Sequence, residues 1–172
     1  MDKIVYAGTL VGQSSPYVQN NMVIGLNKDK ISHIQPRDGF VPPKKTPVVD
    51  WSRFTVMPGL VDSHDHLGID IGDHMALANE NDFVKAMRGV RNAETVLKAG
   101  ITTLRSMGEK NFMDLYWKQA IENNWIRGPR LIISCQLLVK TGGHGWFIGC
   151  LLYTSDAADE SSRGGWGGGG GG

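Results

Sequence analysis

Residues 1–57 alternate apolar and polar positions over short runs, a pattern typical of half-buried β-strands. Two β-rich runs occur at residues 3–11 (KIVYAGTLV) and 21–35 (NMVIGLNKDKISHIQ), and the NKDK within the second is typical of a hairpin turn. The run at residues 48–59 (VVDWSRFTVMPG) predicts a further pair of short strands around a turn at 51–53. We therefore expect a small all-β unit with too little core to be very stable alone.

From residue 58 the pattern changes to an alternation of strands and helices. The predicted elements are, in order, a strand at 59–64, a helix at 81–100, a strand at 101–106, a helix at 111–129 and a strand at 130–139. Because strands that alternate with helices usually pair in parallel, residues 58–149 predict the beginning of a parallel α/β sheet.

Each predicted helix has one apolar face, with residues at spacings of three and four. In the first helix this face consists of Phe83, Met87, Val90, Ala93 and Leu97. In the second helix it consists of Met113, Tyr116, Trp117, Ala120 and Ile121. Gly100 is a stop signal for the first helix. Asn111 is the predicted N-cap of the second helix, which is predicted to end at Gly128-Pro129.

Composition and charge argue against several classes of protein. The 172 residues include 18 Lys and Arg and 17 Asp and Glu, which leaves a net charge of +1. There is no basic stripe and no long apolar run, so we expect neither nucleic acid nor a membrane as a partner. The N-terminal MDKIVYAGTL lacks the pattern of a signal peptide. Two cysteines, Cys135 and Cys150, give no disulfide framework, and a cytoplasmic location is the default expectation.

The C-terminal segment, residues 150–172, differs from the rest of the chain. It ends in GGWGGGGGG and has no helical or strand periodicity, so we expect it to be disordered. A natural flexible tail is one interpretation. The other is an artefact, because CLLYTSDAADE resembles the translation of a common sequencing-library adapter. The fold is therefore predicted without this segment.

The most informative motif is the pair His64 and His66, at the end of the apolar strand predicted at 59–64. Side chains two residues apart in a strand project from the same face, so the two imidazoles should lie side by side. They would lie at the carboxyl end of the strand, where parallel α/β folds bind ligands. Two neutral imidazoles there can bind one divalent cation. The alternative is a chance pair of histidines on a solvated turn.

Four stretches follow one another in the order VVDWSRFTV, VMPGLVDSHDHLG, VLKAGITTLRSMG and RGPRLIISCQLLVKTGGHGW. Together they resemble the amidohydrolase superfamily of metal-dependent hydrolases, in the branch related to imidazolonepropionases and Xaa-Pro dipeptidases. The resemblance covers essentially residues 1–149. It implies an α/β fold in which residues 1–57 form the N-terminal strands of a composite β-sandwich. Residues 58–149 would then form the first three β/α units of a truncated (β/α)8 TIM-like barrel.

The resemblance also implies roles for site residues. His64 and His66 correspond to the first two metal ligands, and Gly143 and His144 to a substrate-facing Gly-Gly-His-Gly loop. The implied cofactor is one or two divalent metal ions, with zinc expected. The family's catalytic aspartate and its remaining ligands lie on later strands that have no counterpart here, so no catalytic residue is assigned. Ser106 stands where this branch often has Asp.

The reaction that the resemblance implies is hydrolysis of a C–N bond by metal-activated water, in an amide, a cyclic amide or a dipeptide. We expect the chain to be a fragment of such an enzyme and to be inactive by itself. The expected partner is the small-molecule substrate, and a homo-oligomeric state is an open possibility for the complete enzyme. The alternative is a non-catalytic α/β fragment or metal-binding module whose histidines are structural.

Overall fold

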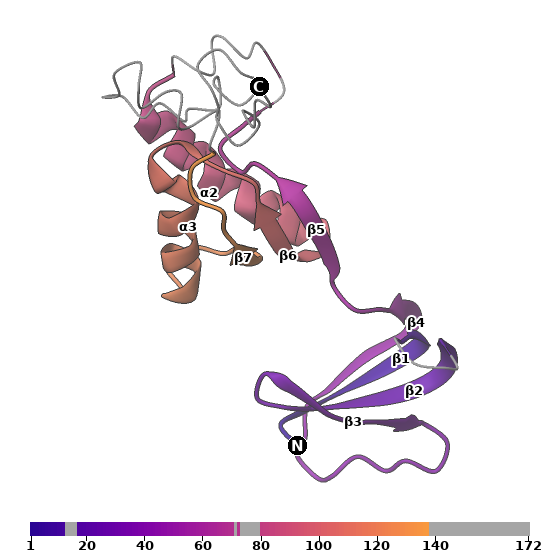
Figure 1. The fold of residues 1–172 in the computed structure, drawn as a ribbon. Coiled ribbons are helices and arrows are strands. Elements are labelled where there is room, and N and C mark those ends of the chain that lie inside the picture. The colour runs from indigo at the N-terminus through magenta and orange to yellow at the C-terminus, as the bar shows by residue number, and fades with distance from the viewer. Residues whose placement is uncertain (13–16, 71, 73–79, 138–172) are drawn as a thin grey trace, which may run out of the picture. The chain divides into compact units, whose positions relative to one another are not determined.

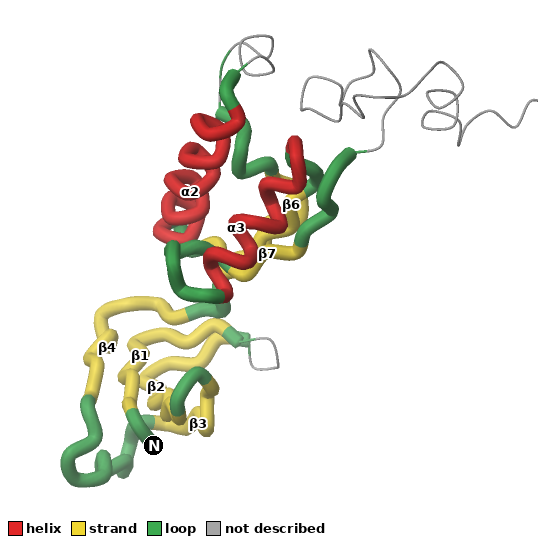
Figure 2. The backbone as a smooth tube through the Cα atoms, turned by 90° about the vertical axis from the view of Figure 1, so that its left-hand side faces the viewer, coloured by secondary structure: helices red, strands yellow, loops and turns green. Residues whose placement is uncertain are grey.

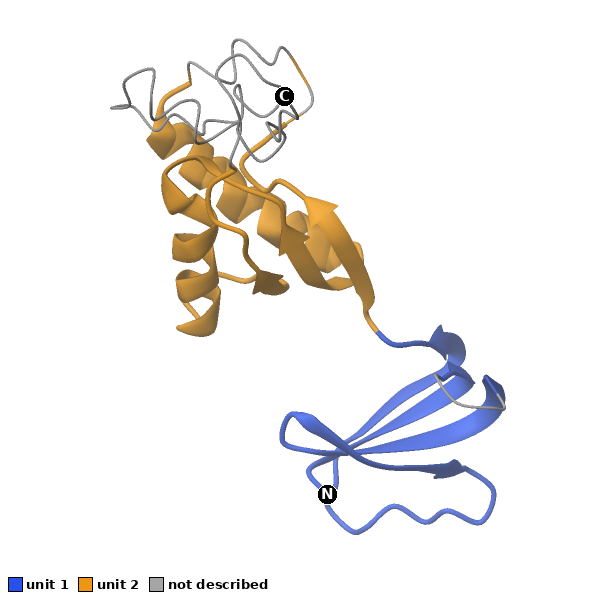
Figure 3. Cartoon of the chain, in the orientation of Figure 1, with its two compact units in different colours: residues 1–58 blue, residues 59–172 orange. Residues whose placement is uncertain are grey.

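The computed structural model describes residues 1–12, 17–70, 72 and 80–137. The chain divides into two compact units, Met1–Pro58 and a second unit that begins at Gly59 (Figure 3). This division lies one residue from the boundary expected between residues 57 and 58. Each unit contains its own sheet, and helices occur in the second, so the chain is of the mixed α/β class.

The first unit is a four-stranded sheet (Figure 1). Its strands are β1 (Lys3–Val11), β2 (Val18–Asn27), β3 (Lys30–Pro36) and β4 (Val48–Val56), in the spatial order β3-β2-β1-β4. β2 pairs with β1 and β3 in antiparallel fashion, whereas β1 and β4 are parallel. The tight connection between β2 and β3 confirms the predicted hairpin. The core of this unit consists of Val5, Ala7, Leu10, Met22 and Ile24.

The turn predicted at residues 51–53 is wrong, because β4 runs through this segment as one strand. The pairing of β1 with β4 instead shifts register between Ala7 and Thr9. Such a bulge takes up extra residues without reversing the chain. A Cβ atom on Gly8 would lie 2.1 Å from the carbonyl oxygen of Ser52, so the absence of a side chain at Gly8 allows the bulged strand to approach.

The second unit alternates strands and helices as predicted. Its elements are β5 (Leu60–Asp65), α2 (Asp82–Lys98), β6 (Ile101–Ser106), the 3₁₀-helix η1 (Lys110–Phe112), α3 (Met113–Glu122) and β7 (Arg130–Ile132). The strand order is β5-β6-β7, and both pairs are parallel. α2 and α3 lie next to each other on one side of this sheet (Figure 2). No helix within the described residues is both long and apolar enough to cross a membrane.

The core of the second unit is built around Trp117. The buried cluster consists of Leu67, Ala93, Leu104, Met113, Trp117 and Leu131. The Trp117 indole lies against Gly89 of α2, where an added Cβ would be 2.0 Å from the ring. Its Nε1 donates a hydrogen bond of 3.0 Å to the carbonyl oxygen of Ala86. The missing side chain at Gly89 therefore sets how closely α2 and α3 pack.

Several predicted details of the helices are wrong. Phe83 and Met87 are 81% and 69% exposed, and Tyr116 is also exposed, because the close contact with Trp117 turns Gly89 toward the core. α3 is shorter than predicted and begins after Phe112. Asn111 is not its N-cap: its backbone has a φ of 54°, and its side chain donates to Asp82. β7 ends at Ile132 and is likewise shorter than predicted.

Candidate metal centre

His64 and His66 lie at the carboxyl end of β5. His64 is within the strand, and His66 is the first residue after it. β5 is fixed by its parallel pairing with β6. The centroids of the two imidazole rings are 5.5 Å apart, with an angle of 72° between the ring planes. The rings are therefore neighbours, as the alternation of side chains along the strand predicts.

The ring of His66 is fixed by the loop that follows β6. Its Nδ1 lies 2.9 Å from the carbonyl oxygen of Gly108. A carbonyl oxygen can only accept a hydrogen bond, so the neutral ring carries its proton on Nδ1 and the lone pair on Nε2. This is the usual arrangement of a metal-binding histidine, whose second nitrogen donates to a carbonyl or a carboxylate.

Two aspartates fix the backbone around the pair. Asp62 Oδ1 accepts a hydrogen bond of 3.0 Å from the His64 amide. Asp65 Oδ1 accepts one of 2.8 Å from the His66 amide, and the carbonyl of Asp65 accepts from Met107. Asp65 thus helps to hold the backbone at His66 in place. His64 itself is exposed, so its imidazole is not part of an apolar core.

The spacing of the two rings fits a divalent cation such as zinc. With a Zn–N distance of about 2.1 Å, each ring centroid lies about 3 Å from the ion, and two ligands at a tetrahedral angle have centroids about 5 Å apart. The observed separation is 5.5 Å. Among the described residues there is no group of three or more His, Cys, Asp or Glu side chains that could hold a metal. The described chain therefore contributes two candidate ligands.

A buried carboxylic acid, Glu109, follows Gly108 in the loop after β6 and was not identified from the sequence. Its side chain is 5% exposed, and its Oε1 accepts a hydrogen bond of 3.0 Å from the Gly68 amide. Burial raises the pKa of Glu109 to about 7, and the nearby Asp114 and Asp65 add to this effect, whereas the Gly68 amide opposes it. The available signal was a carboxylate shortly after an apolar parallel strand, where sites tend to occur.

Two other polar residues are buried close to the end of β6. Asp114 is fully buried and accepts hydrogen bonds from the amides of Leu115 and Cys135, at 3.0 and 2.8 Å. It therefore ties α3 to the segment after β7. Ser106 is fully buried too, and within the described part of the chain its hydroxyl has no hydrogen-bond partner.

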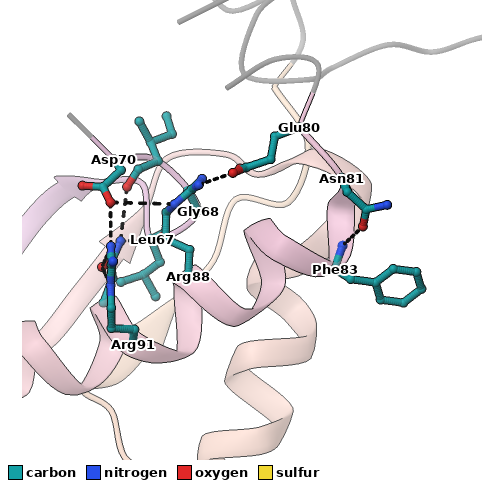
Figure 4. Close-up of polar contacts among 10 residues, drawn as sticks. Leu67, Gly68, Asp70, Glu80, Asn81, Phe83, Arg88 and Arg91 are labelled. Atoms are coloured by element: carbon teal, nitrogen blue, oxygen red, sulfur yellow. Dashed lines mark hydrogen bonds and ion pairs between the residues drawn. The ribbon is translucent and has the colours of Figure 1, made fainter. Parts of the chain in front are cut away.

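The loop after β5 is also held by α2 (Figure 4). Arg88 Nη1 donates a hydrogen bond of 3.1 Å to the carbonyl of Gly68 and forms ion pairs with Glu80 and Asp70. Arg91 Nη2 lies 2.6 Å from Asp70 Oδ2. At the start of α2, Asn81 Oδ1 accepts from the Phe83 amide at 2.8 Å, which caps the helix. The described residues that follow His66, as far as Asp70, are thus attached to a capped helix.

The predicted substrate-binding residues Gly143 and His144 lie outside the described residues. The structure therefore brings together His64 and His66 and adds Gly108 and Glu109 to their surroundings. The metal-binding role of the two histidines stays a prediction.

Comparison with known proteins identifies the family. A model of the amidohydrolase family matches residues 55–163, which is more than half of the chain. The chain belongs to the amidohydrolase family. The match extends into the segment 150–172 that was set apart from the sequence, so the artefact interpretation of that segment stays a prediction. Members of this family generally bind divalent metals.

Solved structures agree with this assignment. The chain is similar to a Xaa-Pro dipeptidase with methionine bound in its active site, with a TM-score of 0.71 and 26% identity over 83% of this chain and 35% of that one. It is also similar to an amidohydrolase at a TM-score of 0.71 and 27% identity, over 83% of this chain and 33% of that one. A prolidase complexed with N-methylphosphonate-L-proline shares the fold at a TM-score of 0.73 and 22% identity, over 94% of this chain and 38% of that one.

The chain spans about a third of the length of the solved structures it matches. No curated protein matches the sequence significantly.

Proposed function

We propose that a protein containing this chain is a metal-dependent amidohydrolase that hydrolyses C–N bonds with metal-activated water. The observation that carries the proposal is the His64–His66 pair at the carboxyl end of β5, with the rings 5.5 Å apart. The hydrogen bond from His66 Nδ1 to Gly108 supports it further, because it leaves Nε2 free to bind a cation.

In this proposal His64 and His66 hold a divalent metal, with zinc expected, as one or two ions. The metal would supply an activated water and would polarise the scissile carbonyl. The Gly108 carbonyl keeps the His66 proton on Nδ1, and Asp62 and Asp65 hold the backbone on which the two rings are carried. No described residue is assigned as the catalytic base.

The proposed substrate is a small-molecule amide, cyclic amide or dipeptide. The similarity to a Xaa-Pro dipeptidase at 26% identity supports a dipeptide among these. Gly143 and His144 are proposed to contact the substrate. We further propose a cytoplasmic enzyme that binds neither nucleic acid nor membranes, with a homo-oligomeric state left open. Its layout would be a composite β-sandwich followed by a (β/α)8 barrel.

The alternative is a non-catalytic fragment or metal-binding module with structural histidines. A structural histidine is usually packed in a core and has its polar atoms satisfied there. His64 is exposed, and it lies beside His66 at the edge where β5 ends. These observations favour a ligand-binding role over a structural one.

The test uses the longer protein encoded by the gene that contains this sequence. Purified with zinc, it should hydrolyse members of a panel of dipeptides and cyclic amides, including Xaa-Pro dipeptides. His64→Ala and His66→Ala should each abolish turnover and reduce the zinc content. His33→Ala is the matched control, because His33 lies in β3 of the other unit and should leave both properties unchanged. Full activity in His64→Ala would contradict the proposal.

A further inference from the structure

Gly108 and Glu109 are hydrogen-bonded to three residues in two segments of the second unit. The Gly108 carbonyl accepts from the His66 ring, and the Glu109 carboxylate accepts from the Gly68 amide. The Glu109 amide in turn donates 2.9 Å to the carbonyl of Cys135, beyond β7. These two residues therefore connect the loop after β5, at both its histidine and its backbone, to the segment after β7.

The contact between Glu109 and the His66 loop depends on close packing. A Cβ atom on Gly68 would lie 2.5 Å from Glu109 Oε2, so the carboxylate lies directly against the backbone. Gly108 has a φ of +117°, which an L-residue with a side chain rarely adopts. In this conformation the Gly108 carbonyl accepts the hydrogen bond from the imidazole. A displaced Glu109 side chain would thus release the Gly68 backbone, and with it the His66 loop, from the peptide that carries the acceptor of the His66 proton.

A carboxylate is a costly side chain at position 109 if its role is only to fill space. Glu109 is nearly fully buried, and Asp65 and Asp114 lie close enough to disfavour its charge. An apolar side chain would fill the same space without this penalty. The interaction that only a hydrogen-bond acceptor can make at this position is the one with the Gly68 amide, two residues beyond His66.

We propose that Glu109 is a positioning residue for His66: by accepting from the Gly68 amide, its carboxylate holds the loop that carries His66 against the Gly108–Glu109 peptide. The imidazole then stays hydrogen-bonded to the Gly108 carbonyl, in the tautomer that binds metal through Nε2. This proposal rests on the proposed function, in which His66 is a metal ligand. Glu109 itself touches neither the metal nor the substrate in this scheme.

The test compares Glu109→Ala, Glu109→Gln and a control, Glu94→Ala, in the longer protein that tests the proposed function. Glu94 pairs with Lys98 on the surface of α2, so its removal takes away a carboxylate from the same unit without touching the loop. One readout is the His66 tautomer, from ¹⁵N NMR of the metal-free protein. The other is the zinc affinity of the same samples by isothermal titration calorimetry.

We expect Glu109→Ala to lose the preference for the Nδ1-H tautomer and to weaken zinc binding about 10- to 100-fold, the range found for outer-shell partners of metal ligands. Glu109→Gln keeps an acceptor oxygen and should largely retain the tautomer preference and the zinc affinity. Glu94→Ala should retain both in full. A purely structural role would lower stability in Glu109→Ala but leave the tautomer unchanged. An unchanged tautomer and zinc affinity in Glu109→Ala would overturn the proposal, as would equal impairment in Glu109→Gln.

Two further outcomes, a variant that does not fold and a protein that binds no zinc, can be told apart from a failure of the proposal. If Glu109→Ala does not fold, Gly68→Ala serves instead, because its Cβ must displace the Glu109 carboxylate; a wild-type tautomer in that variant would overturn the proposal. If the unmodified longer protein binds no zinc at all, the proposed metal-binding function fails. The tautomer of His66 still decides whether Glu109 positions the ring.

Discussion

His66 and Gly108 are 42 residues apart in the sequence and are joined by a hydrogen bond of 2.9 Å between the imidazole Nδ1 and the carbonyl oxygen. The bond crosses from the end of β5 to the loop after β6. Parallel pairing of these strands places their carboxyl ends at the same edge of the sheet. The pairing of β5 with β6 thus fixes the tautomer of His66 through a residue that is distant in the sequence.

Gly108→Ala should destabilise the second unit by about 1–3 kcal/mol, because it adds a side chain at a positive φ and meets Leu137 at 2.4 Å. The measurement is urea denaturation followed by circular dichroism. Gly100→Ala is the matched control. Gly100 has a φ of +94°, but an added Cβ would have nothing within 4 Å. Gly100→Ala should therefore lose only the stability that the unfavourable backbone conformation costs. Equal losses in the two variants would show that the contact with Leu137 does not matter.

Gly89→Ala should destabilise the protein although alanine favours a helix by about 1 kcal/mol over glycine. The reason is that the new Cβ would lie 2.0 Å from the Trp117 ring. A double-mutant cycle separates the two effects. In a Trp117→Leu background, where the ring is gone, Gly89→Ala should become neutral or stabilising, as measured by the free energy of unfolding. A loss of stability that is the same in both backgrounds would contradict this.

Much of the order of elements could be predicted, because the relevant signals are local. The periodicities at residues 3–11, 81–100 and 101–106 correspond closely to β1, α2 and β6. Gly100 ends α2 as predicted, with a left-handed φ of +94°. The face of α2 was not predictable in this way, because apolar spacing favours Phe83 and Met87. The tertiary contact of Gly89 with Trp117 instead turns the helix, and Lys85 is buried.

The candidate site likewise combines features that local sequence signals predict with features that depend on tertiary contacts. The spacing of His64 and His66 is a local signal, and it predicts their proximity because β5 is a strand. For Glu109 the sequence shows only a carboxylate shortly after an apolar strand, since its partners Gly68 and Cys135 are brought to it by the parallel pairing of the three strands. Buried polar groups whose partners come from distant loops are visible only once the sheet is assembled.

The 172-residue chain alone should bind zinc weakly and hydrolyse no dipeptide. The described residues offer two candidate ligands, whereas catalytic zinc sites usually have three from the protein. The chain should also self-associate, because Val61 on β5 is 68% exposed and, within the described residues, β5 pairs with β6 alone. Dialysis with metal analysis, a product assay and size-exclusion chromatography check these points. A monomer that retains stoichiometric zinc and turns over substrate would contradict the prediction.

Glu109 should make the stability of the second unit depend on pH. Burial raises its pKa from 4.5 to about 7, with Asp114 and Asp65 acting in the same direction and the Gly68 amide and Lys85 opposing them. Between these two values the folded chain binds more protons than the unfolded chain. The contribution of Glu109 to stability is therefore fully present below pH 4.5 and is lost as the pH rises through 7.

The size of this effect follows from the two pKa values. A rise from 4.5 to about 7 corresponds to about 3 kcal/mol. Glu109→Gln cannot ionise, so its stability relative to the unmodified chain should increase by about that amount between pH 4 and pH 8. Other titrating groups contribute similarly to both proteins and largely cancel in the difference. Urea denaturation of the pair across this range checks the prediction, and a stability difference that is independent of pH would show that Glu109 ionises as readily in the folded chain as in the unfolded one.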